Sequence, residues 1–74
     1  MRVVGDFFYK AINEGFEVEL EVNGEYTGMV GKEGDNIYMS VHNGRFCAIE
    51  KMYDDTLVFA NNVEIKGNKI IVRG

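Results

Sequence analysis

The sequence predicts a mostly β protein: a short N-terminal helix followed by a strongly bent five-stranded antiparallel sheet that forms a small open barrel. Three observations lead to this fold class. Apolar residues alternate with polar ones over several short segments, Asn-Gly and Gly-Asn pairs separate these segments, and no proline interrupts them. The 74 residues are predicted to form one domain, residues 1–74.

The first predicted element is a helix over residues 7–14, with Asp6 as its N-cap and Gly15 as its C-terminal stop. The hydrophobic period then changes to two, so residues 16–22 are predicted to form a half-buried strand. The polar side of this strand is a row of glutamates: Glu17, Glu19 and Glu21. Such a row is typical of a solvated strand face.

The Asn-Gly pair at residues 23–24 is the strongest hairpin signal in the chain. It leads to a second strand over residues 25–30, in which Gly28 leaves room for a sharp bend. A polar loop precedes a third strand over residues 37–42. The polar side of the third strand carries Tyr38, Ser40 and His42. These residues are therefore predicted to lie away from the main apolar face.

A second Asn-Gly pair, at residues 43–44, leaves two interpretations open: a hairpin turn, or a bulge within one long bent strand. Residues 45–52 continue as a strand in either case. A turn is predicted over residues 53–56, and residues 57–59 begin another strand, which Asn61-Asn62 interrupts before Val63 and Ile65.

The C-terminal segment contains a polar turn between two β-branched runs. Gly67 permits the positive φ of a tight turn, and the last strand is predicted over residues 69–73. Lys66 and Asn68 present a cation and an amide beside Gly67. Such a rim can hold an anion or a base edge, although a turn of this composition is more often only solvated.

Composition narrows the function classes. One cysteine excludes an intrachain disulfide, and one cysteine with one histidine excludes a four-ligand structural zinc site. Cys47 lies in an apolar stretch, so it is predicted to be a small buried hydrophobe. The net charge of −4 argues against sequence-blind binding of nucleic acid through phosphate neutralisation. No cofactor or metal is predicted.

No segment of the chain has the length and apolarity of a signal peptide or a membrane span. The protein is therefore expected to be cytoplasmic, without a membrane partner. A chain this short buries only about 60% of the surface that it exposes when unfolded. Oligomerisation is the expected source of additional stability.

Catalytic interpretations have little support in the sequence. His42 lacks a nucleophile at an interpretable spacing, and Asp54 and Asp55 are explained by a turn. The glycines at residues 24–34 lack the Lys-Ser/Thr pair of a phosphate-binding loop. The protein is predicted not to be an enzyme.

Three stretches of the chain form an ordered series. They are residues 6–28, which begin Asp-Phe-Phe-Tyr-Lys-Ala; residues 35–40, Asp-Asn-Ile-Tyr-Met-Ser; and residues 65–70, Ile-Lys-Gly-Asn-Lys-Ile. The series resembles the Sm-like family of RNA-binding proteins, which includes the Sm, LSm and Hfq proteins. The first stretch looks like the helix and first hairpin of the bacterial RNA chaperones, and the other two look like the two Sm motifs.

The chain departs from the family pattern at several positions. Asp35 lies three residues before Tyr38, where the family has a spacing of two. Ser40 replaces the usual Asn, and Lys66 replaces the usual Arg. Since lysine is a compact point charge without the planar fork of arginine, we expect weaker and less uracil-selective binding than in typical members.

The C-terminal register of the resemblance stays open. In one alignment, residues 66–68 are the second Sm motif. In the other, residues 50–53 and the strand after them match the final strands of the bacterial chaperones, and residues 61–74 are an added hairpin.

The resemblance implies a non-enzymatic ring of about five to seven identical subunits that binds single-stranded RNA near its pore, with a role in RNA processing or RNA chaperoning. The expected nucleic-acid-binding residues are Asp35, Asn36, Tyr38, Ser40, Lys66, Gly67 and Asn68. Tyr38 is expected to stack on a base, Ser40 and Asn36 to bind the base edge, and Lys66 to contact phosphate or cover the base. The number of subunits, the target, the base preference and the choice of RNA or DNA stay open.

A second interpretation belongs to another class. The glutamate row of the first strand and the net charge of −4 suggest a small β-barrel structural or protein-interaction module that uses its acidic face. Binding of oligonucleotides by the purified protein separates this interpretation from the first.

Overall fold

The computed structural model describes residues 1–22, 26–42, 44–45 and 47–74. Eight strands and one helix are present in these residues. In chain order they are β1 (Arg2–Val4), α1 (Gly5–Asn13), β2 (Glu17–Val22), β3 (Tyr26–Glu33), β4 (Asn36–His42), β5 (Cys47–Met52), β6 (Leu57–Phe59), β7 (Asn62–Lys66) and β8 (Lys69–Arg73). The prediction of a mostly β chain with one short N-terminal helix is confirmed.

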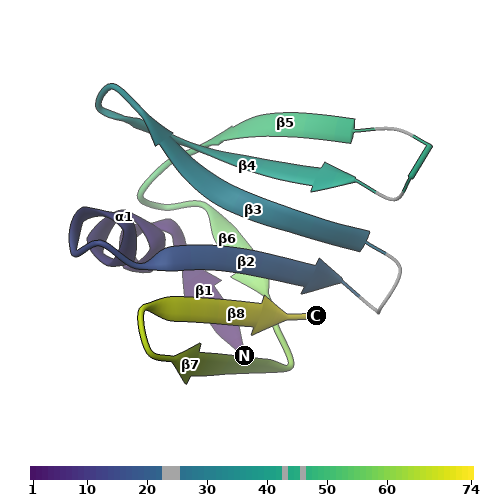
Figure 1. Cartoon of the computed structure of the whole chain (residues 1–74). Helices are drawn as coiled ribbons and strands as arrows, with labels where there is room; N and C mark the ends of the chain where they lie inside the picture. The colour runs from purple at the N-terminus through teal and green to yellow at the C-terminus, as the bar shows by residue number, and fades with distance from the viewer. Residues whose placement is uncertain (23–25, 43, 46) are drawn as a thin grey trace.

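Six strands form one sheet in the order β5-β4-β3-β2-β8-β7 (Figure 1). All neighbours in this sheet are antiparallel except β2 and β8, which run parallel. The predicted all-antiparallel sheet is therefore wrong at this pair. The C-terminal hairpin returns to the free side of β2, where Ile70 and Val72 continue the apolar row that Val18 and Leu20 begin. This shared buried row stabilises the parallel pairing.

The other two strands, β1 and β6, form a separate two-stranded sheet. In Figure 1 this pair crosses behind the large sheet, and α1 lies at one end of it. The prediction of five strands is wrong because it missed the three-residue strand β1 and treated β6 and β7 as one interrupted strand, whereas they belong to different sheets. The described strands form an open sheet covered on one side, and they do not close into a barrel.

The core lies between the six-stranded sheet and the layer made of α1, β1 and β6. Its buried side chains are Val3, Phe8, Ala11, Val18, Leu20, Val30, Ile37, Met52, Ala60, Ile70 and Val72. Phe8 is fully buried and comes from the predicted apolar face of the helix. Tyr9 also joins the layers, because its hydroxyl donates to the carbonyl oxygen of Met52 over 2.7 Å.

The start of α1 differs from the prediction. Asp6 is not the N-cap: it lies in the first turn and forms an ion pair with Lys10 at 3.1 Å. The first amides of the helix are bound by a distant segment, since the N–H of Gly5 donates to the carbonyl of Thr56 and the N–H of Asp6 to that of Asp54. These tertiary bonds replace a side-chain cap. The end is as predicted, with Gly15 at a φ of +93°.

Two glycines reverse the chain at one end of the sheet. Gly34 has a φ of +62° between β3 and β4, and Gly67 has a φ of +57° between β7 and β8. The positive φ predicted for Gly67 is confirmed. At the other end, the predicted Asn-Gly turn at residues 23–24 lies outside the described residues.

The connection after β4 is a hairpin, because β4 and β5 pair antiparallel with His42 opposite Cys47. The alternative of a bulge within one long strand is therefore wrong. Asn43 lies outside the described residues, and Gly44 has a φ of +91°.

Gly28 lies on the core side of β3 at a point of close approach to β4. A side-chain carbon at Gly28 would overlap the carbonyl oxygen of Ser40. Only glycine therefore permits this spacing of the two strands. Across the described residues, no helix has both the length and the apolar composition needed to cross a bilayer.

Candidate functional site

The outer face of the six-stranded sheet, on the side away from α1, divides into two halves. One half is formed by β2, β8 and β7, and the other by β3, β4 and β5. Because side chains alternate along a strand, the outer face carries the residues that alternate with the core. The two halves have different chemistry.

The half formed by β2, β8 and β7 is a ladder of ion pairs. Lys69 contacts Glu19 at 3.1 Å, and Arg73 contacts Glu21 at 3.4 Å. Arg73 also reaches Glu64 on β7 at 2.5 Å. Glu19 and Glu21 of the β2 glutamate row are therefore paired with cations of β8, which the parallel pairing places beside them. The pairing makes this face less acidic than the sequence of β2 suggests, and the acidic interaction face stays a prediction.

The same ladder sets the ionisation of Glu64. The hydrogen bond from Arg73, and to a smaller extent that from Lys66, lowers the pKa of the Glu64 carboxyl below its usual value. In return, the contact with Glu64 raises the pKa of the Arg73 guanidinium. Both groups are thus held in their charged forms.

The half formed by β3, β4 and β5 contains an open groove with a volume of about 530 Å³. Tyr38 and Ser40 of β4 lie in its wall, together with Met29 of β3 and Ile49 of β5. Met29, Ser40 and Ile49 lie side by side in one row across the strands. Tyr38 is half-buried next to this row, opposite Gly31. Because Gly31 has no side chain, the ring of Tyr38 borders open space.

Exposed apolar side chains distinguish this groove from an ordinary solvated face. Met29 is 54% exposed and Ile49 is 68% exposed, although each lies beside a half-buried residue of β4. The hydroxyl of Ser40 is 3.5 Å from the carbonyl oxygen of Met29, a distance at which a hydrogen bond is weak. The Ser40 hydroxyl is thus available to a ligand in the groove.

Lys51 is the cation closest to Tyr38 in register on this face. It lies directly opposite Tyr38 on β5, and its ammonium is 5.1 Å from the ring centre of Tyr53. Sequence reasoning missed Lys51, Met29 and Ile49 as site residues. For Met29 the turn after β3 contained a usable signal: with Gly34 and Asp35 as its two central residues, counting back along both strands places Met29 opposite Ser40.

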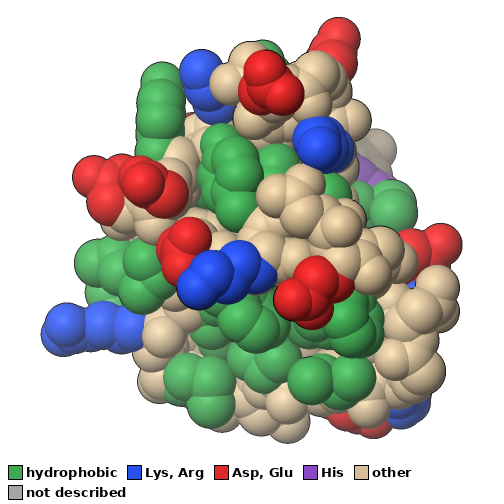
Figure 2. All heavy atoms as spheres, turned by 90° about the vertical axis from the view of Figure 1, so that its left-hand side faces the viewer, with side chains coloured by type: hydrophobic (Ala, Val, Ile, Leu, Met, Phe, Trp, Pro, Cys, Tyr) green, Lys and Arg blue, Asp and Glu red, His purple; other side chains and the backbone are tan. Residues whose placement is uncertain are grey.

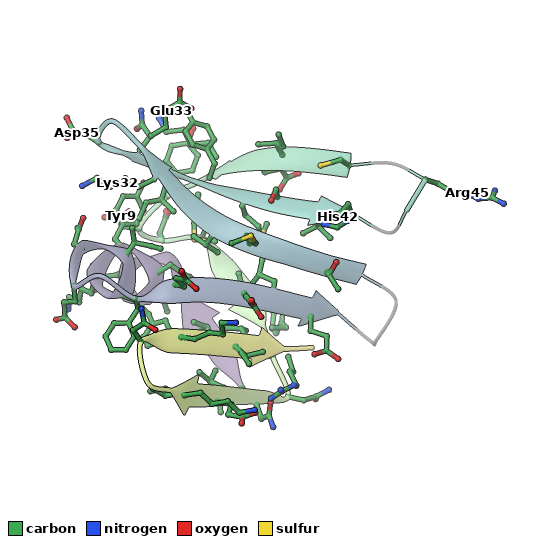
Figure 3. All side chains as sticks on the ribbon, viewed as in Figure 1. Tyr9, Lys32, Glu33, Asp35, His42 and Arg45 are labelled. Carbon is green, nitrogen blue, oxygen red and sulfur yellow. The ribbon has the colours of Figure 1, made fainter. Side chains whose placement is uncertain are left out.

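The predicted residues at the β3–β4 turn do not line the groove. Asp35 is exposed at the tip of the turn, and Asn36 begins β4 opposite Glu33. Figure 3 shows Asp35 and Glu33 at the far end of this turn, with Lys32 on the side of α1. The ammonium of Lys32 donates to the Asn13 side chain of α1 over 3.1 Å. It serves as a link between β3 and the helix.

The predicted residues of the last turn lie in the other half of the outer face. Lys66 is separated from Tyr38 by three strands, a distance of roughly 19 Å at the usual strand spacing. Lys66 forms an ion pair with Glu64 at 3.1 Å, and the carbonyl oxygen of Asn68 accepts a hydrogen bond from the backbone N–H of Glu17. Residues 66–68 and Tyr38 therefore do not form one pocket within a single chain. The closed ring stays a prediction.

Two further predicted residues lie at the opposite end of the outer face. His42 is exposed at the end of β4, as its strand position suggested (Figure 3). Cys47 is also exposed, so its prediction as a buried hydrophobe is wrong. It lies on β5, an edge strand whose outer side no other element covers in the described part of the chain. Among the described residues, no cluster of three or more His, Cys, Asp or Glu side chains could hold a metal ion.

The chain matches no protein-family model, no curated protein and no solved structure.

Proposed function

We propose that the outer face of β3, β4 and β5 binds single-stranded nucleic acid, with one base stacked on Tyr38. The observation that supports this function is the groove of about 530 Å³, in which a half-buried tyrosine, a hydroxyl and two exposed apolar side chains converge. A base offers an apolar face for Tyr38 and polar edges for Ser40. Sheet surfaces with exposed aromatic side chains are a common platform for unpaired bases.

The charge of the molecule is consistent with a binding mode based on stacking. With a net charge of −4, the protein gains little from general attraction to phosphate. Lys51 supplies one local cation opposite Tyr38, where it can contact the phosphate next to the stacked base. Affinity is therefore expected to depend mainly on the aromatic contact, and no catalytic step is proposed.

Fluorescence anisotropy with labelled oligo-uridine, oligo-adenosine and their DNA counterparts tests this proposal. Removal of one stacking interaction costs about 1–3 kcal/mol, so Tyr38→Ala is expected to weaken binding by roughly 5- to 150-fold. Tyr38→Phe should retain most of the affinity, because the ring is kept. The matched control is Phe59→Ala: Phe59 is an aromatic side chain that is 70% exposed on β6, away from the groove.

Binding that is equally strong in wild type and Tyr38→Ala would refute the groove as the site. Absence of binding to all four oligonucleotides by the folded protein would refute the function itself. A preference among them would identify RNA or DNA and the favoured base.

A further inference from the structure

The two edges of the six-stranded sheet, β5 and β7, differ in their protection against further strand pairing. Among the described residues each of these strands has one sheet neighbour, so one side of its backbone has no strand partner. Open edges of this kind can pair with another chain unless charge, proline or a cover prevents it. No proline is present in the sequence to protect either edge.

The β5 edge carries a charge that opposes pairing. Glu50 lies on the core side of β5, opposite Met39, and its side chain is exposed there. Ala48, the other exposed residue on this side, is small. A strand added at β5 would bring its own core side next to a carboxylate and would bury little apolar surface. Inward-pointing charges are a known protection of edge strands.

The β7 edge has apolar residues in the corresponding positions. Val63 and Ile65 point to the core side, and Ile65 is 62% exposed because the covering layer does not reach it. Val63 also lines a groove of about 620 Å³ that continues onto β1 and the start of α1. The apolar residues of this groove are Met1, Val3, Val4, Phe7 and Val63.

Figure 2 views the end of the molecule that carries the turn between β7 and β8. Hydrophobic side chains gather over the lower part of this face, where β7 and β8 lie in Figure 1. The unprotected edge and an apolar surface thus occur together. Apolar surface beside an open strand edge is typical of an association site.

From this difference we infer that two copies of the chain pair antiparallel along β7, with a two-fold axis at Ile65. Of the two-fold registers that keep the core sides of both copies aligned, those centred on Val63, Glu64 or Ile65 pair at least three residues of β7. Centring on Glu64 places two carboxylates opposite each other, and centring on Val63 leaves Ile65 beyond the paired strands. Centring on Ile65 buries the two isoleucines against each other and places Glu64 opposite the partner subunit's Lys66.

The pair extends the six-stranded sheet across the two-fold axis and leaves both Tyr38 grooves open, since these lie near the β5 edges. The contact pairs residues 64–66 of one short strand per copy, so it belongs with the small interfaces of transient complexes. The dimer is expected to be concentration-dependent, with a dissociation constant in the micromolar range.

Disulfide trapping tests the register. In a Cys47→Ser background, Ile65→Cys places one thiol opposite its copy, because directly opposed residues in antiparallel strands have side chains close enough to react. Ile49→Cys is the matched control: Ile49 is 68% exposed on β5, and Ile65 is 62% exposed on β7. After mild oxidation, the Ile65→Cys protein should run mainly as a covalent dimer on a non-reducing gel, and the Ile49→Cys protein mainly as a monomer.

Sedimentation equilibrium measures the association without a crosslink. Wild type should pass from monomer to dimer with rising concentration, and Ile65→Glu should raise the dissociation constant at least tenfold with an unchanged circular dichroism spectrum. Ile49→Glu should leave the dissociation constant unchanged. Equal crosslinking at both positions, or a wild-type protein that is monomeric up to near-millimolar concentration, would overturn the proposal. A closed ring would overturn it as well, since a ring engages both edges and both glutamate variants would then weaken assembly.

Discussion

The two halves of the outer sheet face differ in whether their exposed side chains have partners within the chain. On β2, β8 and β7, charged side chains of both signs alternate and satisfy one another, as in the contacts of Arg73 with Glu21 and Glu64. On β3, β4 and β5, the groove beside Tyr38 contains the exposed apolar side chains of Met29 and Ile49, which no described element covers. A face whose charged side chains pair with one another needs no ligand to partner them. Exposed apolar surface around a groove, in contrast, is a common sign of binding.

Strand pairing, more than local composition, creates this difference. The glutamate row of β2 alone suggests an acidic surface. It is partly neutralised because β8 runs parallel to β2 and presents Lys69 and Arg73 to Glu19 and Glu21. Contacts between segments far apart in the chain therefore decide which half of the face is partnered from within the chain.

Disruption of the boundary between the halves should have the largest effect. β3 joins them, and Gly28 on β3 has no room for a side-chain carbon beside the carbonyl oxygen of Ser40. Gly28→Ala is expected to destabilise the fold by about 3 kcal/mol, which corresponds to a decrease of roughly 12–24 °C in the thermal midpoint. Differential scanning calorimetry measures it. Gly31→Ala is the control, because no atom lies within 4 Å of the added carbon; equal effects of the two changes would contradict the explanation.

Filling the groove should reduce binding without loss of stability. A valine at Gly31 would occupy the space beside Tyr38, and β-branched residues suit a strand. Gly31→Val is therefore expected to weaken oligonucleotide binding about tenfold, which is about 1.4 kcal/mol. Its thermal midpoint should equal or exceed that of wild type. If binding is unchanged while the protein is folded, the groove is not the site.

Removal of one cation from each half should separate their roles. Lys51→Ala takes away the charge opposite Tyr38, and Lys69→Ala takes away a charge from the ion-pair ladder. In the proposed binding mode the ammonium of Lys51 contacts a phosphate, so the slope of log affinity against log salt should become shallower by about 0.7 in Lys51→Ala. The slope for Lys69→Ala should not change. A similar change in both variants would mean that the charge acts over the whole face.

The smallest expected effect concerns acid stability of the ion-pair ladder. Arg73 and Lys66 lower the pKa of Glu64 in the folded state. Its contribution to stability is therefore fully present above the pKa of an unfolded glutamate and is lost as the pH falls through the lowered value. The thermal midpoint of Glu64→Gln should be slightly below that of wild type at neutral pH, and the gap should close in acid. Glu50→Gln is the control, since Glu50 makes no ion pair within the described residues; a gap for Glu64→Gln that is independent of pH would contradict the assignment.

Local sequence patterns predicted the elements whose structure depends on local rules. The strand over residues 69–73, the positive φ of Gly67 and the placement of Tyr38 on the face opposite the core all follow from alternation and turn chemistry. Two residues of the groove, Tyr38 and Ser40, could also be predicted in this way, because they alternate along β4 with residues that face the core.

The features that sequence reasoning missed depend on distant partners. The start of α1 is fixed by hydrogen bonds to the carbonyl groups of Asp54 and Thr56. The prediction of Asp6 as the N-cap was therefore wrong. Cys47 lies among apolar residues, yet β5 is an edge strand without a covering layer. Alternation along one strand indicates which side faces the core but not whether another element covers it.

The parallel pairing of β2 and β8 also has a consequence for the order in which the chain folds. The paired residues Glu17 and Lys69 are separated by about fifty positions, whereas β2, β3, β4 and β5 pair through short connections. As the chain leaves the ribosome, this four-stranded meander can form first, with β2 as a temporary open edge. During that interval the unpaired glutamates of β2 would act as gatekeepers, since like charges discourage the edges of two nascent chains from joining before β8 arrives.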